Sequence, residues 1–195
     1  MTLSVWVIPL LWVVFFSYWT WLAAQASKAG GTPPSRRAER GTSRTTHLLL
    51  MGGAFLLLFC PFLSVGFLAA RFVPEGLATS WVGVALAAAG MAFAVAARLR
   101  LGRNWSGRIE IKRTHELVRS GPYRVTRHPI YTGILLGLLG SALALGEVRG
   151  LVAVALALVA YKRKSATEEL WLEQEFGEHY AAYRREVKAL IPLVL

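Results

Sequence analysis

The sequence predicts an all-α, polytopic integral membrane protein with about five transmembrane helices and an amphipathic C-terminal helix on the cytoplasmic face. Hydrophobic residues make up 55% of the 195 residues and the mean hydropathy is +0.46, which is too apolar for a soluble domain. The apolar residues gather in long runs, whereas the net charge of +11 gathers between them. This pattern favours basic loops beside anionic lipid, so membrane lipid and not nucleic acid is the expected partner.

The N-terminal part, 1–97, is predicted to be a membrane region of three helices. Its first apolar run, 3–24, has the length of a span and carries four tryptophans suited to the membrane interface. The second predicted span, 47–72, contains Pro61, which we expect to kink it. The third, 80–97, is rich in alanine and glycine, so its backbone should approach other helices closely at the centre of the bundle.

The C-terminal part, 98–195, is predicted to hold the functional region. It begins with a polar, strongly basic segment, 98–127. Two short apolar limbs follow, 130–145 and 151–161, and they are separated by a tight polar turn. Each limb is short for a span, so together they predict a helical hairpin.

The distribution of basic residues predicts the orientation. Loops 25–46 and 98–127 and the tail after residue 161 carry most of the lysines and arginines, whereas segments 73–79 and 146–150 carry one arginine between them. The positive-inside rule therefore puts the N-terminus outside and the C-terminus in the cytoplasm. The tail is expected to be an amphipathic helix with breaks, because apolar residues recur near helical spacing.

The stretch 115–133 concentrates histidine, tyrosine, arginine, proline and glycine directly before an apolar helix. Gly121 and the proline after it form a turn signal, and Pro129 suits the first position of the following helix. That helix end would present free N–H groups and partial positive charge beside His128 and Tyr131, which favours an anionic ligand. The alternative is a basic juxtamembrane loop without a ligand.

Glu168 stands where the last span leaves the bilayer, a costly place for a carboxylate without a partner. One interpretation is a surface ion pair with Lys164, one helical turn earlier. The other is that Glu168 faces a polar cavity beneath His128 and Tyr131. Position in the sequence leaves both open.

No metal site is predicted. Cys60 is the single cysteine, so an intrachain disulfide or a multi-cysteine site is impossible. His115 and His128 are separated by 13 positions without a nearby acidic or sulfur cluster, which argues against zinc.

Two blocks of this sequence resemble the isoprenylcysteine carboxyl methyltransferase family and its prokaryotic relatives. The first reads His-Glu-Leu-Val from His115, Gly-Pro-Tyr from Gly121 and Arg-His-Pro-x-Tyr-x-Gly from Arg127. The second begins at Glu168 and Glu169 and continues with regularly spaced aromatic residues to Tyr183. The resemblance covers about 101–192.

This resemblance implies an S-adenosylmethionine-dependent methyltransferase that binds its cofactor on the cytoplasmic side and methylates a lipophilic or lipid-modified substrate. Lys164 and Glu168 are the implied catalytic residues, and Lys164 stands where the family has an arginine. The implied cofactor-binding residues are His115, Glu116, Leu117, Val118, Tyr123, His128, Pro129, Tyr131 and Glu168.

Three alternatives to carboxylate methylation stay open at this point. A phospholipid N-methyltransferase belongs to the same broad class. Membrane sterol reductases, which use NADPH, have a similar Arg-His-Pro-x-Tyr-x-Gly stretch, but they usually carry an asparagine and an acid where this chain has Ile130 and Ile134. A non-enzymatic membrane scaffold would make the convergence of polar residues coincidental.

Overall fold

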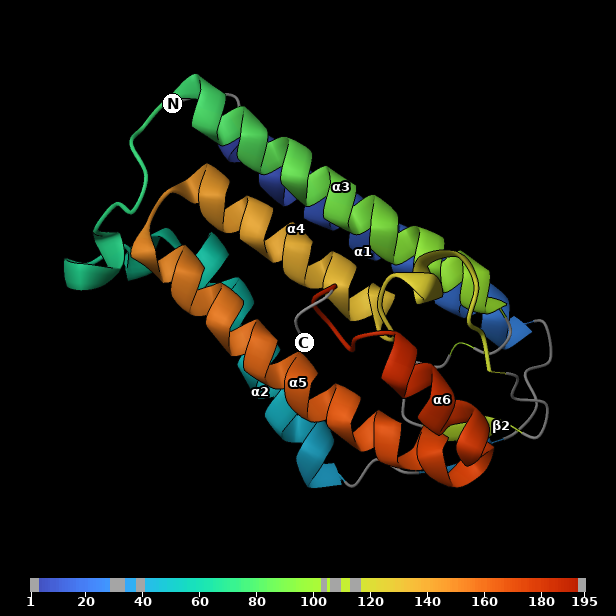
Figure 1. Ribbon diagram of the computed structural model, residues 1–195. Coiled ribbons are helices and arrows are strands. Elements are labelled where there is room, and N and C mark those ends of the chain that lie inside the picture. The colour runs from blue at the N-terminus through green and yellow to red at the C-terminus, as the bar shows by residue number, and fades with distance from the viewer. Residues whose placement is uncertain are drawn as a thin grey trace.

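The computed structural model describes residues 4–28, 34–37, 41–102, 105, 110–112 and 117–192, and it is a bundle of long helices (Figure 1). Its α-helices are α1 (Ser4–Lys28), α2 (Gly41–Phe59), α3 (Leu77–Leu101), α4 (Pro129–Leu145), α5 (Val148–Phe176) and α6 (Glu178–Glu186). Two short strands, β1 (Pro34–Arg37) and β2 (Glu110–Lys112), pair antiparallel. The predicted helical fold class and the α4–α5 hairpin are confirmed.

The closest helix packing in the bundle is between α3 and α4, which run antiparallel and contact each other at glycines. Gly83 lies against Gly140, and Gly90 lies against Gly133. A Cβ atom at Gly90 would stand 2.5 Å from the backbone nitrogen of Gly137, so a side chain there requires the helices to separate. Small residues thus allow the close backbone approach that the sequence predicted for the third helix.

Connections that were predicted to share one side of the membrane lie at the same end of the bundle. The pairing of β1 with β2 brings together the two basic loops that contain them. At the opposite end, the Phe72 N–H donates to the Gly146 carbonyl at 3.0 Å, and the Val148 N–H donates to the Ala70 carbonyl at 2.8 Å. Helices that follow one another in the sequence therefore alternate in direction.

The membrane character is visible in the outer surface of the bundle. Within the described residues, α3 and the 6–26 portion of α1 are long and apolar enough to cross a bilayer, and two further apolar helices are shorter. The outer face of α1 exposes Trp6 by 68%, Leu10 by 61% and Val13 by 61%. Such a continuous apolar face suits lipid and would be unfavourable in water.

The second predicted span, 47–72, was wrong in its extent. α2 ends at Phe59, and two 3-10 turns, Pro61–Leu63 and Gly66–Ala69, follow it. Pro61 has no N–H to continue the helix and favours an extended residue before it; Cys60 has φ −87° and ψ 110°. The proline therefore ends the helix and does not kink it.

The tail is more continuous than the predicted helix with breaks. α5 runs without interruption from the hairpin turn to Phe176, well beyond the apolar limb predicted at 151–161. Gly177, at φ +50°, then turns the chain into α6. The long α5 carries Glu168 back beside the start of α4, and α6 covers the same region (Figure 1).

Candidate active site

The start of α4 is shaped by glycine and proline. Gly121 has φ +63° and opens the 3-10 turn Gly121–Arg124. His128 is the N-cap of α4 and Pro129 is its first residue, as the sequence predicted. Pro129 is fully buried, so the entry of the chain into α4 is fixed by packing as well as by the proline ring.

This entry is also held by the segment after α6. The backbone N–H of Arg127 donates to the Lys188 carbonyl at 2.8 Å, and that of His128 donates to the Ala189 carbonyl at 3.0 Å. Two successive backbone bonds fix the direction in which both side chains leave the chain. The tail is therefore a structural part of the site.

Arg127 forms a nearly buried ion pair with Glu169. Its Nη2 lies 2.6 Å and its Nε 3.0 Å from Glu169 Oε1, and the two side chains are 8% and 13% exposed. The same guanidinium donates to the carbonyls of Arg184, at 3.2 Å, and Val187. Such hydrogen bonding offsets the cost of removing a guanidinium from water.

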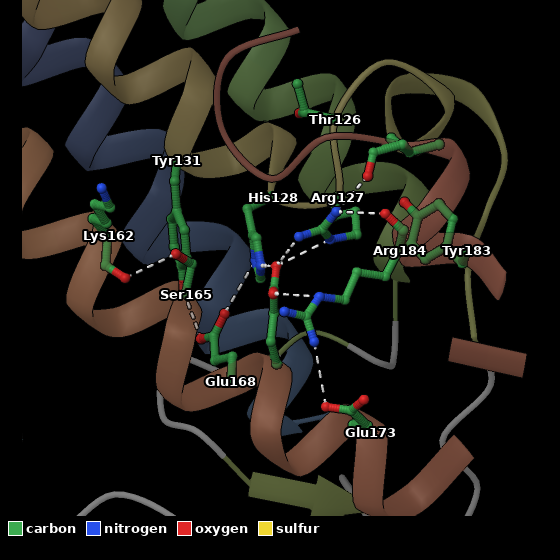
Figure 2. Close-up of polar contacts among 12 residues, drawn as sticks. Thr126, Arg127, His128, Tyr131, Lys162, Ser165, Glu168, Glu173, Tyr183 and Arg184 are labelled. Atoms are coloured by element: carbon green, nitrogen blue, oxygen red, sulfur yellow. Dashed lines mark hydrogen bonds and ion pairs between the residues drawn. The ribbon is translucent and has the colours of Figure 1, made fainter. Parts of the chain in front are cut away.

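His128 lies between two carboxylates, as Figure 2 shows. Its Nε2 is 3.1 Å from Glu169 Oε1, and its Nδ1 is 3.4 Å from Glu168 Oε2. The Tyr131 hydroxyl donates to Glu168 Oε1 at 2.5 Å. We name Arg127, His128, Tyr131, Glu168 and Glu169 the Arg-His-Glu cluster; it joins the start of α4 to α5.

The cluster favours charged forms of its members. Burial lowers the pKa of His128, but hydrogen bonds to Glu168 and Glu169 outweigh burial and raise that pKa. Burial raises the pKa of both glutamates, but His128 outweighs it, with help from Lys164 at Glu168 and Arg127 at Glu169, and both pKa values are lowered. These shifts all favour an imidazolium between two carboxylates.

An aromatic stack adjoins this cluster. The ring centroids of His128 and Tyr131 are 5.5 Å apart, and those of Tyr131 and Tyr161 are 4.6 Å apart. Lys164 Nζ lies 5.5 Å from the Tyr131 ring centroid, and the Glu168 side chain is 22% exposed. Aromatic faces beside an accessible carboxylate attract cations, so this arrangement can hold a positively charged ligand.

The remaining predicted cofactor residues precede α4. Val118 and Tyr123 belong to an apolar cluster that packs against the start of α4, and Tyr123 is buried. Leu117 is half-buried. His115 and Glu116 lie outside the described residues, so their predicted roles have no structural counterpart here.

Of the two interpretations of Glu168, the surface ion pair with Lys164 is not found among the described residues. Glu168 instead meets His128 and Tyr131, the two residues that the alternative interpretation named. Lys164 stays on the same side of α5 and adds to the lowering of the pKa of Glu168. The structure thus brings Lys164, Glu168, His128 and Tyr131 together.

Two cluster members were quoted in the motifs without a predicted role. Arg127 and Glu169 form the shortest ion pair of the cluster, at 2.6 Å. A signal was available, because Glu169 follows Glu168 directly and Arg127 precedes His128 directly. Two adjacent acidic residues and an adjacent Arg-His pair could have predicted two ion pairs, Arg127 with Glu169 and His128 with Glu168.

Comparison with known proteins decides the family. A family model described as phospholipid methyltransferase matches residues 78–179, which is just over half of the chain. The chain belongs to this family. The match runs from α3 through the Arg-His-Glu cluster to the start of α6, so it includes the first sequence block and most of the second.

Individual relatives of this family member agree with the resemblance noted from the motifs. The protein-S-isoprenylcysteine O-methyltransferase of Schizosaccharomyces pombe is 34% identical over 101 residues, 50% of this chain and 43% of that protein. A probable protein-S-isoprenylcysteine O-methyltransferase of Oryza sativa subsp. indica is 30% identical over 118 residues, 59% of this chain and 62% of that protein. The predicted resemblance to isoprenylcysteine carboxyl methyltransferases is confirmed.

A third relative carries a different name. The cobalt-zinc-cadmium resistance protein CzcN of Cupriavidus metallidurans is 37% identical over 117 residues, 58% of this chain and 52% of that protein. Across the three relatives, the matched region spans about half the length of each known protein.

Proposed function

We propose that the protein is an integral membrane methyltransferase that uses S-adenosylmethionine to methylate the carboxylate of a lipophilic or lipid-modified substrate. The observation that carries this proposal is the Arg-His-Glu cluster, in which the two blocks shared with the family meet at the start of α4. The names of the isoprenylcysteine O-methyltransferase relatives support a carboxylate as the acceptor.

The chemistry of the described residues fits this cofactor. S-adenosylmethionine has a cationic sulfonium and an ammonium beside an aromatic base. The stacked Tyr131 and Tyr161 rings and the carboxylate of Glu168 suit its cationic end. The apolar cluster that contains Val118 and Tyr123 suits its base. His115, Glu116, Leu117, His128 and Pro129 complete the proposed pocket.

When bound, S-adenosylmethionine supplies a methyl group that positive sulfur has already activated. A carboxylate oxygen of the substrate forms the new bond to this carbon while the electron pair of the broken carbon–sulfur bond stays on sulfur, and no proton moves. The chain therefore has to position the reactants and exclude water. We assign orientation of the acceptor carboxylate to the Lys164 ammonium and attraction of the cofactor's cationic end to Glu168, which His128 keeps ionised.

The same proposal includes an orientation. We propose five membrane segments with the N-terminus outside and with residues 25–46, 98–127 and 165–195 in the cytoplasm, so that the site faces the cytoplasm. The basic loops support this orientation. Single cysteines placed in 98–127 should resist an impermeant thiol reagent in intact cells; labelling there from outside would reverse the orientation.

Calorimetry on purified protein in detergent tests the cofactor. S-adenosylmethionine should bind, and NADPH should not. His128→Ala and Glu168→Ala should each weaken binding while the helical content by circular dichroism stays the same. Unaltered affinity in both variants would remove the site assignment.

Kinetics test the role of Lys164. A lost charge-assisted hydrogen bond costs about 1.5–3 kcal/mol, so Lys164→Met should raise the KM for a lipophilic acid about 10- to 150-fold. The KM for S-adenosylmethionine should change less, and Lys164→Arg should keep or improve activity because guanidinium also pairs with carboxylate. Equal turnover of acids by Lys164→Met and the parent would exclude Lys164 as the substrate's partner.

Phospholipid N-methylation is the second candidate, and the description of the family model favours it. An amine acceptor would have to lose a proton before or during transfer, which a carboxylate does not. A panel of lipophilic acids and ethanolamine phospholipids separates the two candidates. Methylation of the phospholipid alone would replace the carboxylate proposal.

A further inference from the structure

Arg98 is an unusual residue in the last turn of α3. Only 4% of it is exposed, although α3 is otherwise apolar and rich in small residues. A buried guanidinium is costly unless other groups replace the water it loses. The groups around Arg98 therefore have to account for its burial.

Two tryptophans supply part of this replacement. The Arg98 guanidinium carbon lies 3.2 Å from the Trp105 ring centroid and 4.9 Å from that of Trp19. The two indoles meet edge to face, with centroids 5.7 Å apart. Contacts of this kind attract the cation through the faces of the rings. Such ring contacts provide no hydrogen-bond acceptors for the N–H groups, which point outward in the guanidinium plane.

Those N–H groups are the open feature. Arg98 Nε and Nη1 are both buried and have no hydrogen-bond partner. None of the ion pairs among the described residues includes Arg98. By contrast, Arg100, two residues farther along α3, is exposed and donates to the Ser120 hydroxyl at 2.9 Å. Arg98 thus offers a positive charge and at least two donors to a group that the described chain does not provide.

Arg98 adjoins the proposed cofactor pocket. Its neighbour Ala97 belongs to the apolar cluster that also contains Tyr123 and Val118, and both Trp19 and Trp105 pack against that cluster. Lys164, the proposed partner of the substrate carboxylate, lies instead on α5, against the Tyr131 ring. The two cations therefore serve different parts of the site.

We propose that Arg98 binds the carboxylate of the methionine moiety of S-adenosylmethionine, with Trp19 and Trp105 holding the guanidinium in place. This inference rests on the proposed function, because it requires that S-adenosylmethionine binds here. A carboxylate accepts charge-assisted hydrogen bonds from guanidinium N–H groups, and Arg98 Nε and Nη1 are two such donors without a partner.

Calorimetry with two ligands tests the proposal. Decarboxylated S-adenosylmethionine has the same sulfonium and adenosine but lacks the carboxylate. The parent should bind S-adenosylmethionine about 10- to 150-fold more tightly than the decarboxylated form. Arg98→Met should abolish this preference by weakening only the binding of the carboxylate-bearing ligand. Arg98→Lys, which keeps the positive charge but not the planar guanidinium, should retain part of this preference.

Arg100→Met is the matched control, because it removes the same charge from the same helix and should leave the preference unchanged. An equal loss of affinity for both ligands in Arg98→Met would make Arg98 a purely structural residue and overturn the inference. A parent protein that binds both ligands equally would also overturn it and would assign the donors to another anion, such as a lipid phosphate. If the parent binds neither ligand, the proposed function itself fails.

Discussion

The α4–α5 hairpin carries an ionic cluster at each end, and the two clusters are built differently. At the turn, Arg149 Nε lies 2.6 Å from Glu147 Oε2, and the Ser64 hydroxyl donates to the same oxygen at 2.8 Å. Arg149 Nη1 also donates to the carbonyls of Leu57 and Cys60, both at 2.9 Å. We name Ser64, Glu147 and Arg149 the turn cluster. The other end holds the Arg-His-Glu cluster.

The difference lies in what each cluster leaves available. In the turn cluster the ion pair is local, and its further contacts close the exposed end of α2. The Arg-His-Glu cluster joins distant segments, contains a histidine whose pKa is raised by its two carboxylates, and adjoins the aromatic stack of Tyr131 and Tyr161. One hairpin thus has a closed end that holds helices together and an open end that can meet a ligand.

Breaking the turn cluster should have the largest effect on stability. Arg149→Met leaves the half-buried Glu147 carboxylate without its cation and two helix-end carbonyls without their donor, which should cost about 3–5 kcal/mol of unfolding free energy. Denaturant unfolding in detergent measures this loss. The affinity of the folded fraction for S-adenosylmethionine should stay the same.

Glu75→Gln is the control for that variant. Glu75 pairs with Arg71 at 3.0 Å but is 80% exposed, so its loss should cost less than about 1 kcal/mol. A drop in cofactor affinity in Arg149→Met would contradict the separation of the two ends.

The glycine seam between the two ends should give the next largest effect. Gly90→Ala places a methyl group 2.5 Å from the backbone of α4 and should cost about 1–3 kcal/mol, since the helices have to move apart. Gly52→Ala in α2 meets nothing within 4 Å and should stabilise by about 0.5–1 kcal/mol, because alanine favours a helix. Thermal unfolding of both variants measures the contrast; equal melting temperatures would mean that the seam is loose.

The pH dependence of stability should distinguish the open end. The raised pKa of His128 means that its contribution is complete below about 6.5 and is lost as pH rises through the folded-state pKa. The lowered pKa values of Glu168 and Glu169 act oppositely: their contribution is complete above about 4.5 and is lost as pH falls through the folded-state values. Stability should therefore be greatest between these limits and decline above neutrality, on the order of 1.4 kcal/mol for each unit of the His128 shift.

His128→Gln should remove the alkaline part of this dependence, whereas a substitution in the turn cluster should keep it. Unfolding free energies measured from pH 5 to 9 provide the comparison. An unchanged alkaline slope in His128→Gln would assign that slope to another group.

The smallest effect is expected where α6 covers the open end. The buried Tyr183 hydroxyl donates to the Tyr123 carbonyl at 2.6 Å, so Tyr183→Phe should cost about 1 kcal/mol. Tyr18→Phe, on the exposed face of α1, should change the melting temperature little. Equal effects of the two variants would mean that the hydroxyl bond contributes nothing measurable.

The sequence predicted the parts of this fold that depend on local pattern. The apolar runs predicted the helices, and the alanine and glycine content predicted the close approach of α3 to another helix. The shared motifs implied that Tyr131 and Glu168 are neighbours. Pro61 marked the end of α2 locally but was expected only to kink the helix; that the helix ends there also depends on Arg149, far along the chain, which donates to the carbonyls of Leu57 and Cys60. Long-range contacts of this kind leave no local pattern.

The same limit applied to the site. The family resemblance implied that His128 and Glu168 line one pocket but gave no role to Arg127 and Glu169, whose pairing depends on how far α5 extends beyond the bilayer. The strand pairing of β1 with β2 was also missed, since the two segments are only four and three residues long and neither shows an alternating apolar pattern.

The bonds from Arg127 and His128 to the segment after α6 bear on how the protein is made. The Arg127 side chain donates to the Val187 carbonyl, 60 residues farther along the chain, and the two backbone bonds end at Lys188 and Ala189. During synthesis, α1 to α5 can therefore enter the bilayer before this part of the site exists. These bonds can form only after residue 189 has left the ribosome, so insertion of the helices into the membrane and completion of the Arg-His-Glu cluster are separate events in time.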